Sequence, residues 1–221
     1  MSLTQKSTLN QQTYETLLNM LFSGDLPMGT QLDERELSQK LGVSRTPLRE
    51  AITTLAREGL VQYAPYNGNF VKEWDVKQVE DLYIVRRALE VLAIQLAIPK
   101  LSDEDIDKIH AIVSKAGRAL DENDLLAFAK FDSQFHEFIV QKTGNETLID
   151  SLKRLSLQIQ MIRTIANRDP EVVHRTSYER PRILEALKNR DVESAAQLMA
   201  DHIDGVRKAV VSQILKGEPY A

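Results

Sequence analysis

The residues Leu-Gly-Val-Ser-Arg-Thr-Pro-Leu-Arg-Glu-Ala, at positions 41–51, decide the fold of the first third of the chain. Gly42 can end one helix in the left-handed conformation that glycine tolerates, and Ser44 can cap the next helix. Pro47 is compatible with the first turn of that helix, where backbone amides have no helical partner. Two short helices separated by a three-residue break form the helix-turn-helix pattern.

Helical spacing of apolar residues extends this pattern in both directions. It predicts a first helix over residues 9–22 and a second over residues 33–41. The helix that Ser44 caps should reach residue 58, because Gly59 follows as a stop signal. The break at residues 42–44 therefore joins the second and third of three helices.

A β-hairpin signal follows the third helix. Two short apolar-rich segments, residues 60–63 and 69–71, flank the sequence Pro65-Tyr66-Asn67-Gly68. Asn-Gly between such segments is a strong signal for a tight hairpin turn. Three helices and a hairpin in this order predict a winged helix-turn-helix domain over residues 1–73.

From Val76 onward the chain is predicted to be all-helical. Apolar spacing and helix-breaking residues give six helices, at about residues 76–98, 102–120, 123–142, 146–167, 172–189 and 192–215. Pro181 falls inside the fifth helix and should kink it or mark its true start. We expect residues 76–221 to form an antiparallel all-α bundle, which makes the fold class mainly α.

The composition is that of an ordinary globular protein with a net charge of −4. The chain has no cysteine, which excludes disulfides and thiolate metal sites and fits the reducing cytoplasm. The first residues lack the apolar run of a signal peptide, and no stretch approaches the roughly 20 apolar residues of a membrane span. Residues 1–74 hold seven Lys and Arg against eight Asp and Glu, a net charge of −1. Any contact with nucleic acid must therefore come from a local basic cluster.

The third predicted helix carries such a cluster. Arg45, Thr46 and Arg49 lie opposite its predicted buried face and near its N-terminus, the end that a recognition helix presents to base edges. The arginine fork matches the acceptors of guanine and the oxygens of phosphate. The alternative is that Arg45 and Arg49 form a solvated face, paired with Glu50 or Glu36. The predicted buried face consists of Leu48, Ala51, Ile52 and Leu55.

Contacts to the DNA backbone are expected around this helix. Ser44 and the free amides of the first turn can take a phosphate. Arg35, on the preceding helix, is placed to contact the backbone of double-stranded DNA. The tip of the predicted wing, Tyr66-Asn67-Gly68, could reach a minor groove.

This region resembles the DNA-binding domain of GntR regulators over about 60 residues without a gap. The resemblance implies that Arg35, Arg45, Arg49 and the wing at Gly68 contact operator DNA. It also implies a homodimer that reads two half-sites. The stretches that carry it are Gly24–Leu32, Glu34–Leu37, Leu41–Ala51, and Leu55 with Glu58–Val61.

The third helix of the predicted bundle carries a carboxylate and an imidazole on one face. Asp132 and His136 are four residues apart and therefore share a face. Such a pair can be half of a metal site, although it is more often a buried histidine hydrogen-bonded to its carboxylate. His202, on the last helix, could complete a cluster across the bundle.

The second half also resembles a family, the FCD effector domain of FadR-type GntR regulators, over about 130 residues. The resemblance implies a divalent metal held by one Asp and three His, with a small carboxylate effector bound to the metal. Asp132, His136 and His202 fall on three of these ligands, and the fourth falls on Arg180. The matching stretches are Leu82–Arg86 with Leu89-Glu90, Asp132-x-x-Phe135-His136 followed by Gly144-Asn145, Ala186-Leu187 with Asp191 and Ala195, and His202.

Arg180 is a departure from that pattern. Arginine does not give up its proton to become a metal ligand, so the set of four is broken. His174 lies six residues earlier, about 240° around a helix, and could replace it only if Pro181 disrupts the turn.

Arg180 leaves two interpretations of the pocket open. In the first, its guanidinium pairs with Asp132, and Arg180 and Arg86 bind a small anionic effector without a metal. In the second, Asp132, His136 and His202 hold zinc or nickel as three ligands, with water and effector completing the shell. Close-range repulsion between a guanidinium and a metal ion favours the first. An inert Arg180–Asp132 ion pair in a bundle without effector is the third possibility.

These patterns together predict a sequence-specific DNA-binding transcriptional regulator. A small anionic effector in the bundle would change the separation of the two wings in a dimer, and thereby their fit to the operator. The alternatives are a metal-dependent hydrolase built on Asp132, His136 and His202, and a DNA-bound scaffold without effector. No further acid or nucleophile converges on the hydrolase site, so we do not expect an enzyme. Effector contacts are expected from Arg86, Asp132, His136, Arg180 and His202.

Overall fold

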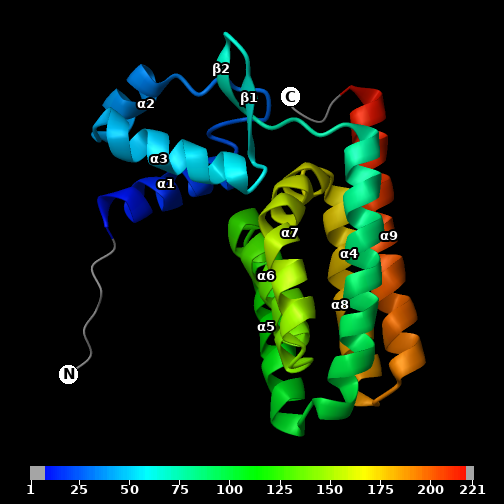
Figure 1. Ribbon diagram of the computed structural model, residues 1–221. Coiled ribbons are helices and arrows are strands. Elements are labelled where there is room, and N and C mark those ends of the chain that lie inside the picture. The colour runs from blue at the N-terminus through cyan, green and yellow to red at the C-terminus, as the bar shows by residue number, and fades with distance from the viewer. Residues whose placement is uncertain (1–7, 218–221) are drawn as a thin grey trace, which may run out of the picture. The chain divides into compact units, whose positions relative to one another are not determined.

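The computed structural model describes residues 8–217, which fall into two units that meet in the sequence between Glu73 and Trp74 (Figure 1). Residues 1–7 of the predicted first domain and 218–221 of the second lie outside the described residues. In the described part, no helix is both long and apolar enough to cross a lipid bilayer.

The first unit begins with three helices: α1 (Leu9–Ser23), α2 (Glu34–Leu41) and α3 (Arg45–Arg57). Their ends follow from local side-chain chemistry. The side chain of Asp33 accepts hydrogen bonds from the first free amides of α2, and Gly42 ends that helix with a φ of 66°. The structure confirms the predicted helix-turn-helix.

The core of this unit lies between α1 and α3. The predicted inner face of α3 is confirmed, since all four of its apolar residues are buried. Leu17 and Leu21 of α1 pack on the same core. The opposite face of α3 is therefore left to solvent. The buried residues of α3 include Leu48, Ala51, Ile52 and Leu55.

The wing consists of β1 (Val61–Ala64) and β2 (Gly68–Val71), which pair antiparallel. The hairpin was predicted, but its turn is not centred on Asn67-Gly68. Pro65 and Tyr66 occupy the middle of the turn, and the Asn67 amide closes it by donating to the Ala64 carbonyl oxygen at 3.0 Å. Tyr66 takes the positive φ, at 66°, as the third residue of a type II turn does after a proline. The fixed φ of Pro65 thus overrides the Asn-Gly preference.

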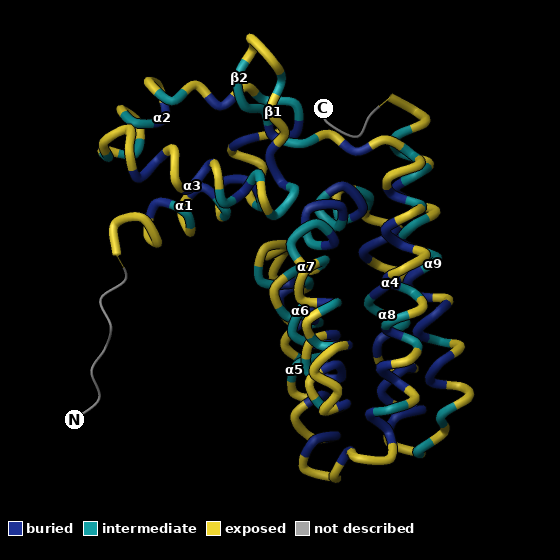
Figure 2. The backbone as a smooth tube through the Cα atoms, in the orientation of Figure 1, coloured by how far each residue is buried: buried dark blue, intermediate teal, exposed yellow. Residues whose placement is uncertain are grey.

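The second unit is a bundle of helices (Figure 1). A single 3₁₀ turn, η1, covers Ile98–Lys100. Figure 2 shows that the buried stretches of these helices face one another across the bundle. The predicted antiparallel all-α bundle is confirmed. Its α-helices are α4 (Val76–Ala97), α5 (Asp103–Asp121), α6 (Leu125–Lys142), α7 (Glu146–Ala166), α8 (Pro170–Lys188) and α9 (Val192–Lys216).

The helix boundaries agree with the predicted ones to within about two residues because polar caps precede the helices. The largest differences are at the starts of α6 and α8. The latter begins at Pro170 because a proline is accepted in the first helical position. Pro181 lies inside α8, so the prediction that it could mark the start of this helix is wrong. Side-chain caps come from Asp75, Ser102, Asp124, Asn145, Asp169 and Asp191.

Candidate functional site

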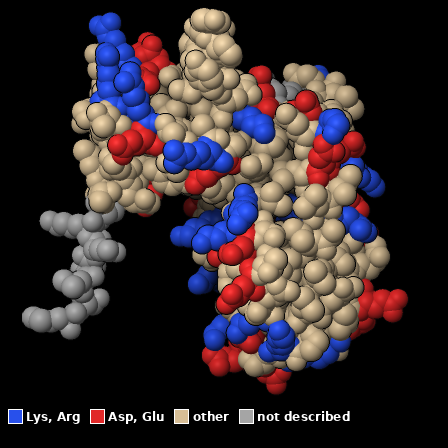
Figure 3. Space-filling model, in the orientation of Figure 1, with Lys and Arg blue, Asp and Glu red and all other residues tan. Residues whose placement is uncertain are grey.

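The N-terminal end of α3 presents its polar residues to solvent. Ser44, Arg45, Thr46 and Arg49 are all exposed, opposite the buried apolar face. Ser44 precedes the helix but makes no side-chain capping hydrogen bond, so its hydroxyl and the first-turn amides can receive a phosphate. In Figure 3, basic side chains gather around α2, with acidic ones beside them. This is a local basic cluster in a unit without a basic excess.

Arg49 is held in place by an ion pair. Its Nε donates to Glu34 Oε2 on α2 at 2.6 Å, while 63% of its side chain stays exposed. The two terminal nitrogens of the guanidinium are left for an outside acceptor. The predicted alternative partners were Glu50 and Glu36, and the observed partner is Glu34 instead. Glu50 accepts a hydrogen bond from Asn10.

The other predicted DNA contacts are also accessible. Arg35 is exposed in the first turn of α2. Tyr66 and Asn67 are exposed at the tip of the wing, and Gly68 opens β2 with a φ of 92°. The side chain of Gln31 donates to the Asn67 carbonyl oxygen at 2.6 Å, which ties the wing tip to the segment before α2.

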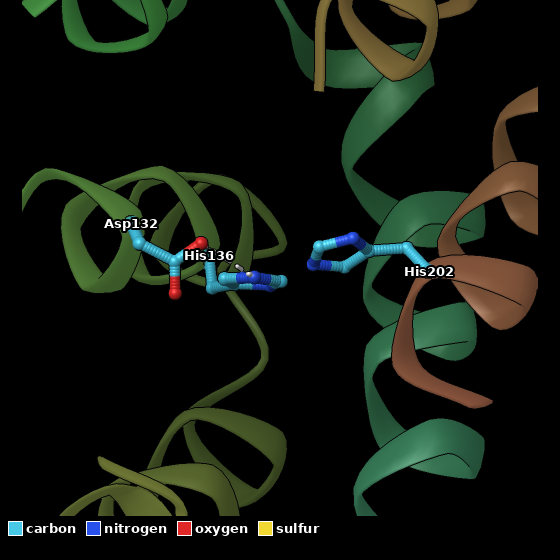
Figure 4. Close-up of side chains that lie close together, drawn as sticks. All are labelled: Asp132, His136 and His202. Atoms are coloured by element: carbon cyan, nitrogen blue, oxygen red, sulfur yellow. Dashed lines mark ion pairs between the residues drawn. The ribbon is translucent and has the colours of Figure 1, made fainter. Parts of the chain in front are cut away.

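A cluster of buried charged and imidazole side chains crosses the middle of the bundle. Asp132 and His136 project from α6 toward His202 on α9 (Figure 4). The two imidazole rings stack with centroids 5.4 Å apart. Arg86 and Arg180 enter from α4 and α8. All five side chains are at least nine-tenths buried.

Asp132 is bound by two guanidinium groups. Arg180 donates to its Oδ1 from Nε at 2.7 Å and also from Nη2, and Arg163 of α7 forms an ion pair with its Oδ2. The Arg180 Nη1 donates to the Thr176 carbonyl oxygen at 2.9 Å, and its guanidinium lies over the ring of Phe128. Burial lowers the pKa of Arg180 to about 10 and, with Arg86 nearby, that of Arg163 to about 9. Both guanidinium groups are therefore protonated at neutral pH.

Each histidine is oriented by a carboxylate. The Nδ1 of His136 pairs with Glu90 Oε2, and the Nδ1 of His202 pairs with Glu179 Oε2 at 2.7 Å. Arg86 Nη2 lies 3.4 Å from His136 Nε2, which must accept because a guanidinium only donates. Burial lowers the pKa of His136 and lowers that of His202 to about 3, so both rings are neutral.

The fit of a metal ion can be judged from these contacts. Asp132, His136 and His202 offer ligand atoms within 4.8 Å of one another. The oriented histidines suit a metal, but both oxygens of Asp132 are committed to guanidinium groups. His174 is exposed on α8, which continues through Pro181, so it does not supply the missing ligand. The residues present therefore do not fit a divalent ion.

A cavity of about 380 Å³ lies between α4, α6 and α7, beside this cluster. Glu90, Ser133, His136 and Arg163 line it from the cluster. Exposed polar residues, among them Lys153, line it from the solvent side. Its apolar wall consists of Val140, Ile149, Leu152 and Ile159.

The structure brings the predicted effector residues together but places only His136 on the cavity wall. Sequence reasoning missed Arg163, Glu90 as a partner of His136, and Glu179 as a partner of His202. A signal for Arg163 was present, because it follows Leu152 and Ile159 on the apolar side of its helix, where a basic residue is out of place.

Comparison with known families gives matches to two models. The model described as "Bacterial regulatory proteins, gntR family" matches residues 9–71, which contain α1, α2, α3 and the wing. The FCD domain model matches residues 81–205, more than half of the chain and the whole buried cluster.

Whole-chain comparisons agree with these matches. The chain is 26% identical to the HTH-type transcriptional repressor RspR of Escherichia coli, over 91% of this chain and 89% of the relative. It is 27% identical to the HTH-type transcriptional regulator YdhC of Bacillus subtilis, over 87% of each. Among solved structures, it is similar in fold to E. coli McbR/YncC, with a TM-score of 0.80 and 22% identity over 95% of this chain and 100% of that one. A GntR regulator from Rhodococcus sp. RHA1 gives a TM-score of 0.82 at 18% identity, over 93% and 99%.

Proposed function

Because the chain belongs to the GntR family of bacterial transcriptional regulators and carries an FCD domain, we propose that it binds operator DNA under the control of a small anionic effector. The observation that carries the effector part is the cavity in the bundle, which Arg163 lines while its guanidinium reaches Asp132 in the buried cluster. A basic group at the end of a small cavity is a recognition element for a carboxylate.

The proposed DNA contacts come from α3 and the wing. Arg45 and Arg49 would read base edges from the N-terminal end of α3, with Thr46 between them. Ser44 and Arg35 would hold phosphates, and Asn67 and Gly68 would approach the minor groove. This arrangement needs few positive charges, which is compatible with the slightly negative balance of the unit.

We propose that two copies of the chain act together on two half-sites. An exposed apolar stripe on α4 is available for a second copy to cover. Binding of the effector would then change the separation of the two wings and their fit to the operator spacing. The stripe consists of Ile84, Val85 and Leu92.

The effector site is proposed to work without a metal. The guanidinium of Arg180 neutralises Asp132 in place of a metal ion, and the two neutral histidines stack beside this ion pair. The family and the fold are those of transcriptional regulators and not of enzymes, so a hydrolase at Asp132, His136 and His202 has no support. A DNA-bound scaffold without an effector would not account for the cavity at Arg163.

The proposal is tested by selecting duplexes from a random-sequence pool with the purified protein. We expect a two-fold symmetric or near-symmetric site, bound by two chains per duplex. At about 0.15 M salt, the protein should bind the selected duplex at least about 1,000-fold more tightly than a scrambled duplex. Equal affinity for the selected and the scrambled duplex, measured by fluorescence anisotropy, would overturn sequence-specific regulation.

A further inference from the structure

We infer that Arg163 is the anchor for the effector, and that the effector is a small monocarboxylate with a short apolar body. This inference rests on the ligand site of the proposed function and makes it specific. It differs from the sequence-based expectation, which assigned the anion to Arg86 and Arg180.

The position of Arg163 distinguishes it from the other two buried arginines. Arg86 and Arg180 are 1% and 3% exposed, and neither lines the cavity. Arg163 keeps 12% of its side chain exposed and lines the cavity, while its Nη1 reaches Asp132. It is therefore the guanidinium that a ligand in this cavity would meet.

Arg163 also has hydrogen-bonding capacity to spare. Its Nε is buried and has no hydrogen-bond partner among the described residues, and its Nη2 donates to Ser133 Oγ at a long 3.3 Å. Arg180 uses Nε and Nη2 on Asp132 and Nη1 on the Thr176 carbonyl oxygen. Every nitrogen of Arg180 is engaged, and Arg86, whose Nη1 is also unpartnered among the described residues, does not line the cavity. Arg163 is therefore the one of the three that can donate to a second anion.

The charge balance of the cluster sets the charge of the ligand. Glu90 compensates Arg86, and Asp132 compensates Arg180. Glu179, which holds His202, is compensated by Arg175 at 3.2 Å. His136 is neutral because its Nε2 accepts from Arg86, and the buried ring of His202 stacks on it. Arg163 therefore remains as one positive charge in excess inside the bundle. A monoanion neutralises this excess. A dianion would bring an additional negative charge toward Glu137 and Asp150, two carboxylates that line the same cavity beside a single lysine, Lys153.

The rest of the cavity sets the body of the ligand. At about 380 Å³, it is near the lower end of the range for ligand pockets, about 300 to 1,000 Å³. Between its polar inner and outer ends, four apolar side chains of α6 and α7 line it, which favours a short aliphatic chain or a single ring over a polyhydroxylated body. The apolar side chains are those of Val140, Ile149, Leu152 and Ile159.

The first test uses the unmodified protein and a fixed panel of probes. Butyrate, hexanoate and benzoate are compared with butyramide, hexanamide and benzamide, and with succinate and glutarate, in the presence of chelator. We expect at least one monocarboxylate to raise the melting temperature, its own amide to have no effect, and the dicarboxylates to bind at least about tenfold more weakly. Equal binding of acid and amide, preferential binding of dicarboxylates, or binding of none of the three monocarboxylates at 10 mM (roughly the weakest useful affinity) would overturn the inference.

The second test assigns the anchor. In Arg163→Gln, Asp132 keeps its pair with Arg180, so the bundle should fold, which circular dichroism checks. We expect its affinity for the active monocarboxylate to fall by about 30-fold. The matched control is Arg154→Gln, on the exposed side of the same helix and outside the cavity lining, which should bind like the unmodified protein. Unchanged affinity in Arg163→Gln would refute the assignment.

The two levels of the proposal fail differently. If the acid binds through Arg163 but leaves operator affinity unchanged, the anchor stands and effector control is refuted. If another ligand controls operator affinity and Arg163→Gln responds to it normally, regulation stands and the anchor is refuted.

Discussion

Arg49→Ala is expected to lower affinity for the selected operator by at least about 100-fold. One bidentate arginine–guanine contact contributes about 1 to 3 kcal/mol of discrimination, and the homodimer that we propose would lose two of them. The fold should survive, because Arg49 is mostly exposed and loses only its ion pair with Glu34, which at the surface stabilises by about 1 kcal/mol or less. Anisotropy titrations with selected and scrambled duplexes measure the change.

The control for this variant lies on the same helix. Arg57 is exposed in the last turn of α3, far along the helix from the end proposed to read bases. Arg57→Ala should keep the preference for the selected duplex. If Arg49→Ala retains that preference too, or if both variants lose it equally, α3 does not read the operator through its N-terminal end.

Arg180→His is expected to give the bundle a metal site that the unmodified protein does not have. The substitution removes the guanidinium from Asp132 Oδ1 and adds an imidazole, next to two histidines whose Nδ1 atoms are already held by carboxylates. One Asp and three His suit zinc or nickel. With metal at about 100 times its dissociation constant, the stabilisation is about 2.7 kcal/mol, a rise in melting temperature of roughly 5 to 10 °C.

Metal content after dialysis with zinc, together with the thermal shift, distinguishes the outcomes. Arg180→Gln is the matched control, because it removes the same charge without adding a ligand. Neither Arg180→Gln nor the unmodified protein should bind zinc in stoichiometric amount. Tight zinc binding by the unmodified protein would show that Asp132 leaves its guanidinium partners for a metal, and the metal-free site would be wrong.

The bounds of the helices could be predicted from the sequence because the ends of a helix depend on residues next to them in the chain. Asp33 and Asn145 cap the amides that follow them, and Gly42 takes a left-handed conformation at its own position. The wing turn was harder to predict, because two local preferences compete there. Pro65 fixes the turn one residue pair earlier than Asn67-Gly68 would.

The buried site was only partly predictable. The i, i+4 pair Asp132–His136 and the displaced ligand position at Arg180 are visible in the sequence and in its resemblance to the FCD family. The roles of Glu90 and Arg163 as partners could not be predicted, since their contacts depend on how α4 and α7 are rotated against α6. Helical periodicity gives the side of a helix on which a residue lies, but not which residue it meets across a bundle.

Operator affinity measured with and without a saturating monocarboxylate, in chelator, tests effector control most directly. The saturating concentration is set beforehand by the thermal shift that the same acid gives. We expect the dissociation constant for the selected duplex to change by about fivefold or more, with no effect of the matching amide. A bound monocarboxylate that leaves the dissociation constant unchanged would contradict effector control of DNA binding through this bundle.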